Sequence, residues 1–330
     1  MSKVTPETLK HRIEGTLKGL FESRTLPLYD MMSYHFGLHE DALSKHAGFI
    51  HGSTLLLSVD AFGGKVDNAL PASVAVELVN GFCEIHDDVE SGRPQRSERD
   101  ALWWIWGPAQ AINAGDGMHA LARISVLQLA ENGFSSELTY GAISLLDRAS
   151  LLACEGRFRD LEMQERVEVS LDAYTRMSSD RSGALFGASL SIAALLSGLD
   201  KLDQEKLTQC GKWIGESRQI RSDIEELWSS EPGHNLEFLN KKKLFPVVAA
   251  MRNASPNEKR RLGEVYFKRV LEPEDLKPVR AIVEGLGGRE ESEERIKHCE
   301  ENCRTVFHEI CKEADGGDRL LDFLTDITLT

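Results

Sequence analysis

Two short groups of carboxylates, more than a hundred residues apart, are the side chains of this sequence best suited to chemistry. Asp87 and Asp88 lie in the segment EIHDDVES, and Asp223 and Glu226 lie in the segment QIRSDIEE. Both segments continue an apolar pattern typical of helices, where carboxylates are costly to bury unless they bind a metal or pair with cations. The two groups are therefore candidate metal ligands.

Helical geometry extends each group into a polar face, because a helix returns to the same face every three to four residues. One face carries Glu84, Asp87, Asp88 and Ser91, and the other carries Gln219, Ser222, Asp223 and Glu226. Two such faces, opposed across a bundle, suit Mg²⁺, which prefers oxygen ligands and is usually completed by waters and substrate phosphates. We therefore expect a phosphorylated substrate. Two solvated acidic helix faces are the alternative.

The composition indicates a large globular protein with few classes of partner. The chain has 330 residues, of which 41% are hydrophobic and 28% charged, with a net charge of -14. Its acidic balance argues against nucleic acid as a partner. The best apolar run, LLLSVDAF, is too short for a membrane span and contains Asp60. Without a secretion signal at the N-terminus or a disulfide spacing among six cysteines, the chain is expected to be cytoplasmic.

The elements that must position these residues are helices. Apolar residues recur at three- and four-residue intervals through most of the chain, and the alternation typical of strands is scarce. We expect an all-α fold in which residues 1–330 form a single large helical bundle. Helix breakers are expected at Gly63-Gly64, SGRPQRSERD, Asn132-Gly133, Gly198 and around Pro232. Near the end, EESEERIKHCEENC predicts an exposed helix followed by a short C-terminal tail.

From MMSYHFG to NKKKLFPVV, the order of segments resembles the trans-polyprenyl diphosphate synthase family, which has the class I isoprenoid synthase fold. HDDVES stands in the place of that family's first Asp-Asp-x-x-Asp motif, and QIRSDIEELW in the place of the second. Between and after them, EGRFRDLEM resembles Gly-Gln-x-x-Asp-Leu, RSGAL the Lys-Thr pair, and KKKLFPV the Lys-Thr-Leu-Pro segment. The resemblance implies a central cavity, a prenyl diphosphate substrate, Mg²⁺ and a homodimer.

Departures from the family pattern fall on the residues that bind isopentenyl diphosphate. The family's Gly-Lys-Arg-x-Arg-Pro segment is similar to residues 47–52 here, AGFIHG, in which His51 is the one residue that can carry positive charge. The second of two consecutive family arginines is Ser97, and the family's His or Gln before the first motif is Asn80. A diphosphate is strongly disfavoured without cations around it, so this second-substrate site is expected to be lost.

Residues that the resemblance assigns to the allylic diphosphate or its carbocation are retained. Gln219 and Arg181 are the predicted catalytic residues. The predicted substrate contacts are Arg96, Arg181, Ser182, Lys243 and Phe82. Arg157 stands where the family has glutamine, so it either binds diphosphate or pairs with Asp160 or Glu155.

The predicted magnesium ligands are Asp87, Asp88, Asp223 and Glu226, with Glu84 and Ser222 as further candidates. Serine is a weaker ligand than carboxylate for a divalent cation, so the serines that replace family aspartates should lower metal affinity. Glu84 stands where the family usually has an apolar residue. It either restores a carboxylate or forms a salt bridge to a neighbouring helix.

These patterns favour a class I terpene synthase-like enzyme. It would ionise one allylic prenyl diphosphate with Mg²⁺ and let the carbocation cyclise or lose a proton. Three alternatives stay open: a prenyltransferase with a different acceptor, a chain-elongating polyprenyl diphosphate synthase, and a non-catalytic partner subunit of a synthase. The sequence leaves the substrate length and product skeleton undetermined.

Overall fold

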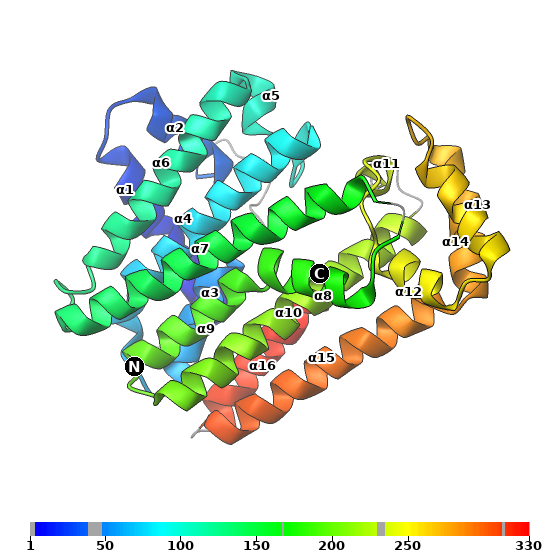
Figure 1. Cartoon of the computed structure of the whole chain (residues 1–330). Helices are drawn as coiled ribbons and strands as arrows, with labels where there is room; N and C mark the ends of the chain where they lie inside the picture. The colour runs from blue at the N-terminus through cyan, green and yellow to red at the C-terminus, as the bar shows by residue number, and fades with distance from the viewer. Residues whose placement is uncertain (1–3, 39–47, 167, 230–234, 312–313, 330) are drawn as a thin grey trace. The chain divides into compact units, whose positions relative to one another are not determined.

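The computed structural model describes residues 4–38, 48–166, 168–229, 235–311 and 314–329 (Figure 1). Ala47 and the breaker expected around Pro232 lie outside these residues. Helices dominate the described chain, and its strands are limited to one short hairpin, so the all-α prediction is confirmed. The other expected breakers all fall between helices.

The first half of the chain contains α1 (Pro6–Glu22), α2 (Pro27–His35), α3 (Ile50–Ala61), α4 (Val66–Ser91), β1 (Gln95–Arg96), β2 (Arg99–Asp100), α5 (Leu102–Trp106), α6 (Pro108–Leu127) and α7 (Ser136–Gln164). The second half contains α8 (Leu171–Arg181), α9 (Ala184–Leu196), α10 (Lys201–Trp228), α11 (Leu236–Leu239), α12 (Phe245–Asn253), α13 (Pro256–Tyr266), η1 (Pro273–Asp275), α14 (Leu276–Gly285), α15 (Gly288–Ile310) and α16 (Ala314–Leu329).

Two compact units divide the chain. Unit 1 consists of Met1–Ser150, Leu185–Gly211 and Val306–Ile327. Unit 2 consists of Leu151–Ala184, Lys212–Thr305 and Thr328–Thr330. The boundaries fall inside α7, α9, α10, α15 and α16. A single helical domain over the whole chain therefore stays a prediction.

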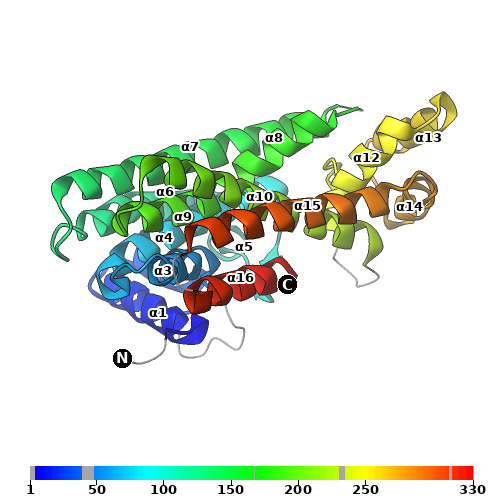
Figure 2. The ribbon, with the colours of Figure 1, turned by 90° about the horizontal axis from the view of Figure 1, so that it is seen from below.

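In unit 1, α4 packs along α6 on one side and against α3 on another, as the two views in Figures 1 and 2 show. Its apolar positions, among them Val74, Leu78 and Ile85, are buried, and it ends at Gly92, whose positive φ of 63° suits glycine. Gly81 lies where α4 meets the residues at the end of α2, because a Cβ at Gly81 would be 2.7 Å from the ring of Phe36. The end of α2 can therefore pack directly on the helix that carries the first acidic segment.

In unit 2, two glycines let neighbouring backbones meet. A Cβ on Gly156 of α7 would be 2.3 Å from the main-chain nitrogen of Arg181, at the end of α8. A Cβ on Gly215 of α10 would be 2.2 Å from the nitrogen of Gly183. Contacts this close exclude any side chain on either glycine. They fix the backbone of residues 181–183 against both α7 and α10.

The C-terminal region differs from the expected exposed helix and tail. One stripe of α15 is buried, including Ile296, Cys299 and Phe307. The expected tail is the helix α16, in which Leu320 and Leu324 are buried. The charged sequence of α15 hid an apolar stripe at helical spacing, which is why the region was expected to be exposed. Within the described ranges, no helix is long and apolar enough to cross a membrane.

Glu77 is a fully buried carboxyl group on α4. It accepts a 2.6 Å hydrogen bond from the main-chain nitrogen of Gly52 in α3. Burial raises the pKa of Glu77 to about 8, against the opposing effect of the main-chain hydrogen bonds from Gly52 and His51. In the folded protein at neutral pH, the Glu77 side chain is therefore mainly protonated and neutral.

Glu77→Gln should change the pH dependence of stability, because an amide keeps the shape of the neutral acid. The folded-state pKa lies above the unfolded one, so the stability from neutral Glu77 is complete below about pH 4.5 and lost as pH rises towards 8. Urea unfolding should show the variant gaining on wild type over this window, by about 1.4 kcal/mol per unit of pKa difference at most. Glu131→Gln, at an exposed position, is the control. A stability difference that stays constant from pH 5 to pH 8.5, roughly the window of this linkage, contradicts the assignment.

Candidate active site

The hairpin β1–β2 presents two arginines beside α4. Arg96 and Arg99 are cross-strand partners, and the two-residue turn between them is Ser97-Glu98. Both turn residues have positive φ, 49° and 61°, which is the backbone of a tight hairpin turn that usually contains Asn and Gly. This turn therefore keeps a strained backbone next to a charged cluster.

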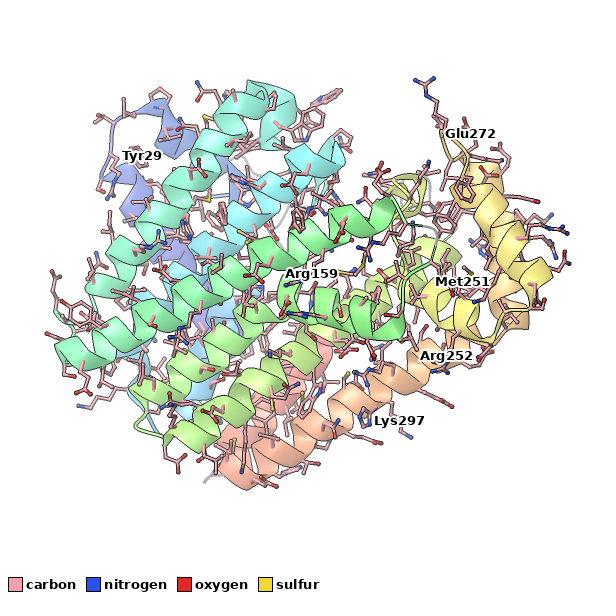
Figure 3. All side chains as sticks on the ribbon, in the orientation of Figure 1. Tyr29, Arg159, Met251, Arg252, Glu272 and Lys297 are labelled. Carbon is pink, nitrogen blue, oxygen red and sulfur yellow. The ribbon has the colours of Figure 1, made fainter. Side chains whose placement is uncertain are left out.

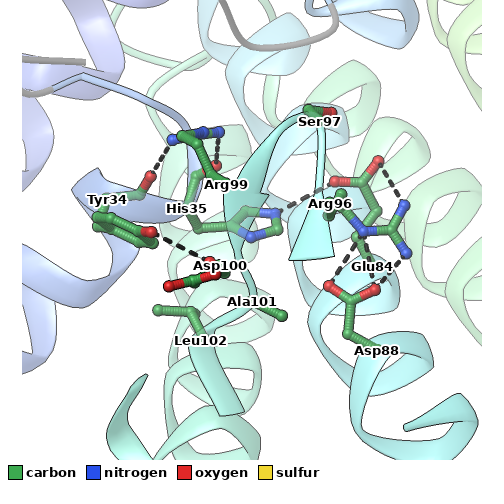
Figure 4. A pocket seen from close by; sticks show the side chains of 10 residues that line it. All are labelled: Tyr34, His35, Glu84, Asp88, Arg96, Ser97, Arg99, Asp100, Ala101 and Leu102. Carbon is green, nitrogen blue, oxygen red and sulfur yellow. Dashed lines mark hydrogen bonds and ion pairs between the residues drawn. The ribbon is translucent and has the colours of Figure 1, made fainter. Parts of the chain in front are cut away.

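Arg96 is held by the carboxylates of the first acidic segment. Its Nε is 3.0 Å from each Asp88 carboxylate oxygen, and its Nη2 donates to Asp88 at 2.7 Å and to Asp87 at 3.4 Å. Glu84 lies 3.8 Å from Nη1 (Figure 4). Burial lowers the pKa of Arg96, but the charges of Glu84, Asp88 and Asp87 outweigh it and raise the pKa overall. Arg96 is therefore charged, as predicted for a diphosphate contact, and its present partners are carboxylates.

Asp88 is 3% exposed, and burial raises its pKa although Arg96 works in the opposite direction. Arg93 adds a second cation, with its Nε 3.7 Å from the Asp88 carboxylate. Asp87 is more accessible, with its side chain 15% exposed. The hydroxyl of Ser91 donates to the main-chain oxygen of Asp87, one turn back along α4. The first segment thus offers Asp87 and Asp88 as adjacent carboxylates.

Glu84 forms the salt bridge that was one of its two predicted roles. His35 Nε2, from the end of α2, lies 3.2 Å from its carboxylate on the side away from Arg96. Arg99 donates to the main-chain oxygens of Tyr34 and His35, at 2.5 and 2.9 Å, and so binds the end of α2 to the hairpin. Together these residues line an open hollow with about 370 Å³ of empty space. His35 and Arg99 were not predicted, since their contact with α4 depends on packing between distant segments.

The second acidic segment, on α10, is engaged differently. Both oxygens of Asp223 accept hydrogen bonds: one from the Tyr174 hydroxyl and from the main-chain nitrogen of Phe245 at 2.7 Å, the other from Gln219 at 2.9 Å. Burial raises the pKa of Asp223 to about 6, although these hydrogen bonds act to lower it. Glu226 accepts from the main-chain nitrogens of residues 237 and 238 at the start of α11. Ser222 is exposed.

The predicted catalytic residues Gln219 and Arg181 lie together. Gln219 Oε1 accepts from Arg181 at 3.0 Å and from the hydroxyl of Ser182 at 2.9 Å. Its amide nitrogen donates to Asp223. The fold thus joins Arg181, Ser182 and Gln219, which the sequence predicted, in a hydrogen-bond network that ends on Asp223.

Three cations of unit 2 lie close to the carboxylate of Asp160 on α7. Its carboxylate lies 2.9 Å from Arg157, 3.5 Å from Lys242 and 3.6 Å from Arg181. Lys242 also contacts Glu237. Of the predicted alternatives for Arg157, the structure shows the ion pair with Asp160. Figure 3 labels Arg159 on the same helix, which pairs with Glu155 and with Asp180 of α8 instead.

Lys243 was the predicted substrate contact in the KKK run, but its neighbour Lys242 is the one beside Asp160. The Lys243 ammonium donates to the main-chain oxygens of Gln164 and Lys241, and it lies 4.5 Å from the centre of the Tyr266 ring. Burial lowers the pKa of Lys243 to about 8. The run is not helical, so periodicity gave no sign of which lysine would reach the cluster.

Phe82, predicted to contact substrate, packs between α4 and α6. Its ring is 4.6 Å from that of His86 and 5.0 Å from that of His119. These contacts place it in the interface between the two helices. Its role towards substrate stays a prediction.

The donor chemistry of unit 1 fits Mg²⁺ better than that of the second segment. Asp87 and Asp88 supply the one or two carboxylates that Mg²⁺ commonly takes from protein, with phosphates and waters completing its shell. In the described part of the chain, no group of three or more His, Cys, Asp or Glu side chains is arranged to hold a metal.

Arg96→Gln should destabilise the protein, because it leaves the buried Asp88 carboxylate without its bidentate partner. Arg96 is about a quarter exposed, so we expect a loss of about 2 kcal/mol, below the range for a fully buried pair. Adding Asp88→Asn should recover part of it, and urea unfolding of the four proteins measures the coupling. Arg93→Gln, which removes the 3.7 Å contact, should cost under about 1 kcal/mol. If Arg96→Gln costs as much in the Asp88→Asn background as in the wild-type protein, the pair is not the source of the loss.

Comparisons with known proteins agree with this geometry. The sequence profile described as polyprenyl synthetase matches residues 41–283. The chain is 30% identical over 277 residues to a geranylgeranyl diphosphate synthase from Mycobacterium tuberculosis, covering 81% of this chain and 77% of that protein. It is 26% identical to a (2E,6E)-farnesyl diphosphate synthase from Mycobacterium bovis, with 84% and 79% covered. The structure of a polyprenyl synthetase from Streptomyces coelicolor A3(2) matches with a TM-score of 0.85 and 26% identity, covering 98% of each chain. This chain, with its carboxylate and cation clusters on an all-helical frame, belongs to the polyprenyl synthetase family.

Proposed function

We propose that the protein is a chain-elongating prenyltransferase, which joins an allylic prenyl diphosphate to isopentenyl diphosphate. Its relatives are named geranylgeranyl and farnesyl diphosphate synthases, and these names support elongation over the terpene synthase-like reaction favoured in the sequence analysis. The observation that carries the proposal is the cluster around Asp160. There, the cations of Arg157, Arg181 and Lys242 converge on the carboxylate of Asp160.

Three cations brought together among partly buried groups suit a diphosphate. Arg181 and Arg157 are 19% and 12% exposed, so their charges are weakly screened. Guanidinium groups bind phosphate oxygens in pairs, and Lys242 adds a compact point charge. These three cations would stabilise the negative charge that develops on the leaving diphosphate as the carbon–oxygen bond breaks.

The cluster in unit 1 is richer in carboxylates. Glu84, Asp87 and Asp88 face the guanidinium groups of Arg93 and Arg96, an excess of one negative charge before His35 is counted. Asp87 and Asp88 would hold Mg²⁺, which when bound supplies Lewis-acid stabilisation to a diphosphate. Arg96 would then transfer from its carboxylates to a phosphate oxygen, because its planar donors serve either partner.

A second candidate, the reaction of a single allylic diphosphate, is favoured by the segment expected to bind isopentenyl diphosphate. Phe49 is 1% exposed, begins α3 with a left-handed backbone and packs 6.0 Å from the ring of Phe36. The ring of His51 packs 4.3 Å from that of Phe186. Ser97 lies in the hairpin turn. These residues lie in apolar packing or in a turn, and they do not form a group of cations suited to a second diphosphate.

We also propose a homodimer. Ile112, Ile124 and Leu127 of α6 and Tyr140 of α7 are exposed apolar side chains within unit 1, between 42% and 67% accessible. A second copy would cover them, since association removes exposed apolar side chains from water. Sedimentation equilibrium should give twice the chain mass, and Ile124→Glu with Leu127→Glu should shift it towards monomer. A wild-type monomer at about 10 μM, where obligate dimers are associated, contradicts the proposal.

Substrate assays with mass spectrometry test the reaction. With Mg²⁺ and geranyl, farnesyl or geranylgeranyl diphosphate, longer diphosphates should form only when isopentenyl diphosphate is added. Asp87→Ala should lower the rate roughly 100-fold, as expected for loss of a group that stabilises developing charge, while Glu294→Ala at an exposed position should not.

Hydrocarbon or terpene alcohol from one allylic diphosphate alone would overturn elongation and establish the second candidate. Turnover that requires another acceptor, or another synthase chain, would identify one of the remaining alternatives.

A further inference from the structure

The environment of Asp223 is that of a structural carboxylate. It is 3% exposed, and its three donors come from three different elements: Tyr174 from α8, Gln219 from α10 and the main chain at Phe245 from α12. Tyr174 is itself 0% exposed. A metal at this carboxylate would have to compete with three donors for its two oxygens, one of which already accepts two hydrogen bonds.

The orientation of the Gln219 amide follows from its partners. Arginine can only donate, so the amide atom facing Arg181 must be the oxygen. The atom facing the Asp223 carboxylate must then be the nitrogen, which is the arrangement observed. Asp223 and Arg181 thus fix the same amide from opposite ends, and the hydroxyl of Ser182 adds a second donor to the oxygen.

Arg181 is held at two points. Gln219 accepts from its Nη1 at 3.0 Å, and Asp160 lies 3.6 Å from its Nε. The close approach of Gly156 to its main chain restrains the backbone of the same residue. The direction of the guanidinium therefore depends on Gln219 keeping its oxygen towards Arg181.

We propose that Asp223 is a positioning residue rather than a magnesium ligand: through Gln219 it orients the guanidinium of Arg181 for the diphosphate. This rests on the proposed use of a diphosphate substrate. It assigns different work to two acidic segments that look alike in sequence. Asp87 would bind the metal, and Asp223 would position the guanidinium of Arg181 in the cation cluster.

Asp223→Asn is the informative substitution, because it keeps the size of the side chain. Tyr174 and Phe245 both donate to one oxygen, so the oxygen of the new amide will take that place. Its nitrogen then faces the nitrogen of Gln219, two donors with no acceptor between them. Gln219 must turn its amide over and present N–H groups to Arg181 and Ser182, which breaks the chain to the guanidinium.

The test compares Asp223→Asn with Asp87→Asn, the same change in the other segment. Binding of Mn²⁺ alone is followed by electron paramagnetic resonance, and binding of inorganic diphosphate with Mg²⁺ by calorimetry. We expect Asp87→Asn to weaken Mn²⁺ binding about 10-fold or more and Asp223→Asn to change it less than about 2-fold. Asp223→Asn should weaken diphosphate binding about 10-fold.

Two further variants separate positioning from loss of structure. Gln219→Leu removes the link and should reproduce the diphosphate defect, and adding Asp223→Asn to it should cost little more. Gln219→Leu also tests the inference should Asp223→Asn fail to fold. Tyr174→Phe removes a donor to Asp223 without reversing the Gln219 amide, so it should lower the melting temperature and leave diphosphate affinity within about 3-fold.

Loss of Mn²⁺ binding in Asp223→Asn equal to that in Asp87→Asn would overturn this inference alone. So would equal diphosphate defects in Tyr174→Phe and Asp223→Asn, or additive defects in the double variant. A wild-type protein that binds no diphosphate would overturn both the inference and the proposed function. Elongation that fails while these binding results hold would overturn the proposed function only.

Discussion

The burial of carboxylates is the constraint on which both charged clusters depend. A carboxylate removed from water needs cations or hydrogen-bond donors at close range. Asp88 receives them from Arg96 on the hairpin, and Asp223 receives them from α8, α10 and α12. In each case some of the compensating groups come from other elements, so one buried carboxylate helps to set where those elements lie within its unit.

The two ways of compensating a carboxylate have different consequences for a metal. Asp88 is paired with cations, and Mg²⁺ in place of the Arg96 guanidinium would offset the one surplus negative charge of the cluster. The guanidinium released in such an exchange is itself a good partner for phosphate. Asp223 is paired with neutral donors, which would be left buried without an acceptor if a metal took the carboxylate. Similar acidic sequences can therefore have dissimilar chemistry.

Sequence reasoning reached the fold and part of the site because those features are local. Helical periodicity, breakers at Gly63-Gly64 and Gly198, and the order of the motifs each depend on residues close together in the chain. The same periodicity placed Gln219 and Asp223 one turn apart, and the structure joins them. What it missed depends on packing. His35 meets Glu84 only because Gly81 admits the end of α2.

Lys242 and Lys243 show most clearly that contacts set by packing cannot be predicted from local sequence, since the two residues are adjacent and chemically identical. Outside a helix, no period determines which side chain points to a given neighbour. Only the fold directs Lys242 to Asp160 and Lys243 to main-chain oxygens. Resemblance to a family identifies the segment that contains these lysines, but it does not identify which lysine contacts Asp160.

The same reasoning bears on the second substrate. Isopentenyl diphosphate needs cations wherever it binds, and the segment that supplies them in the family is here occupied by the buried Phe49 and by His51 against Phe186. Within unit 1 the hairpin still carries two guanidinium groups. Arg99 is committed to the end of α2, whereas the partners of Arg96 are the carboxylates that a metal would take. If the protein elongates prenyl chains, Mg²⁺ held by Asp87 and Asp88 would free Arg96 for a phosphate oxygen, because these carboxylates are the present partners of its guanidinium.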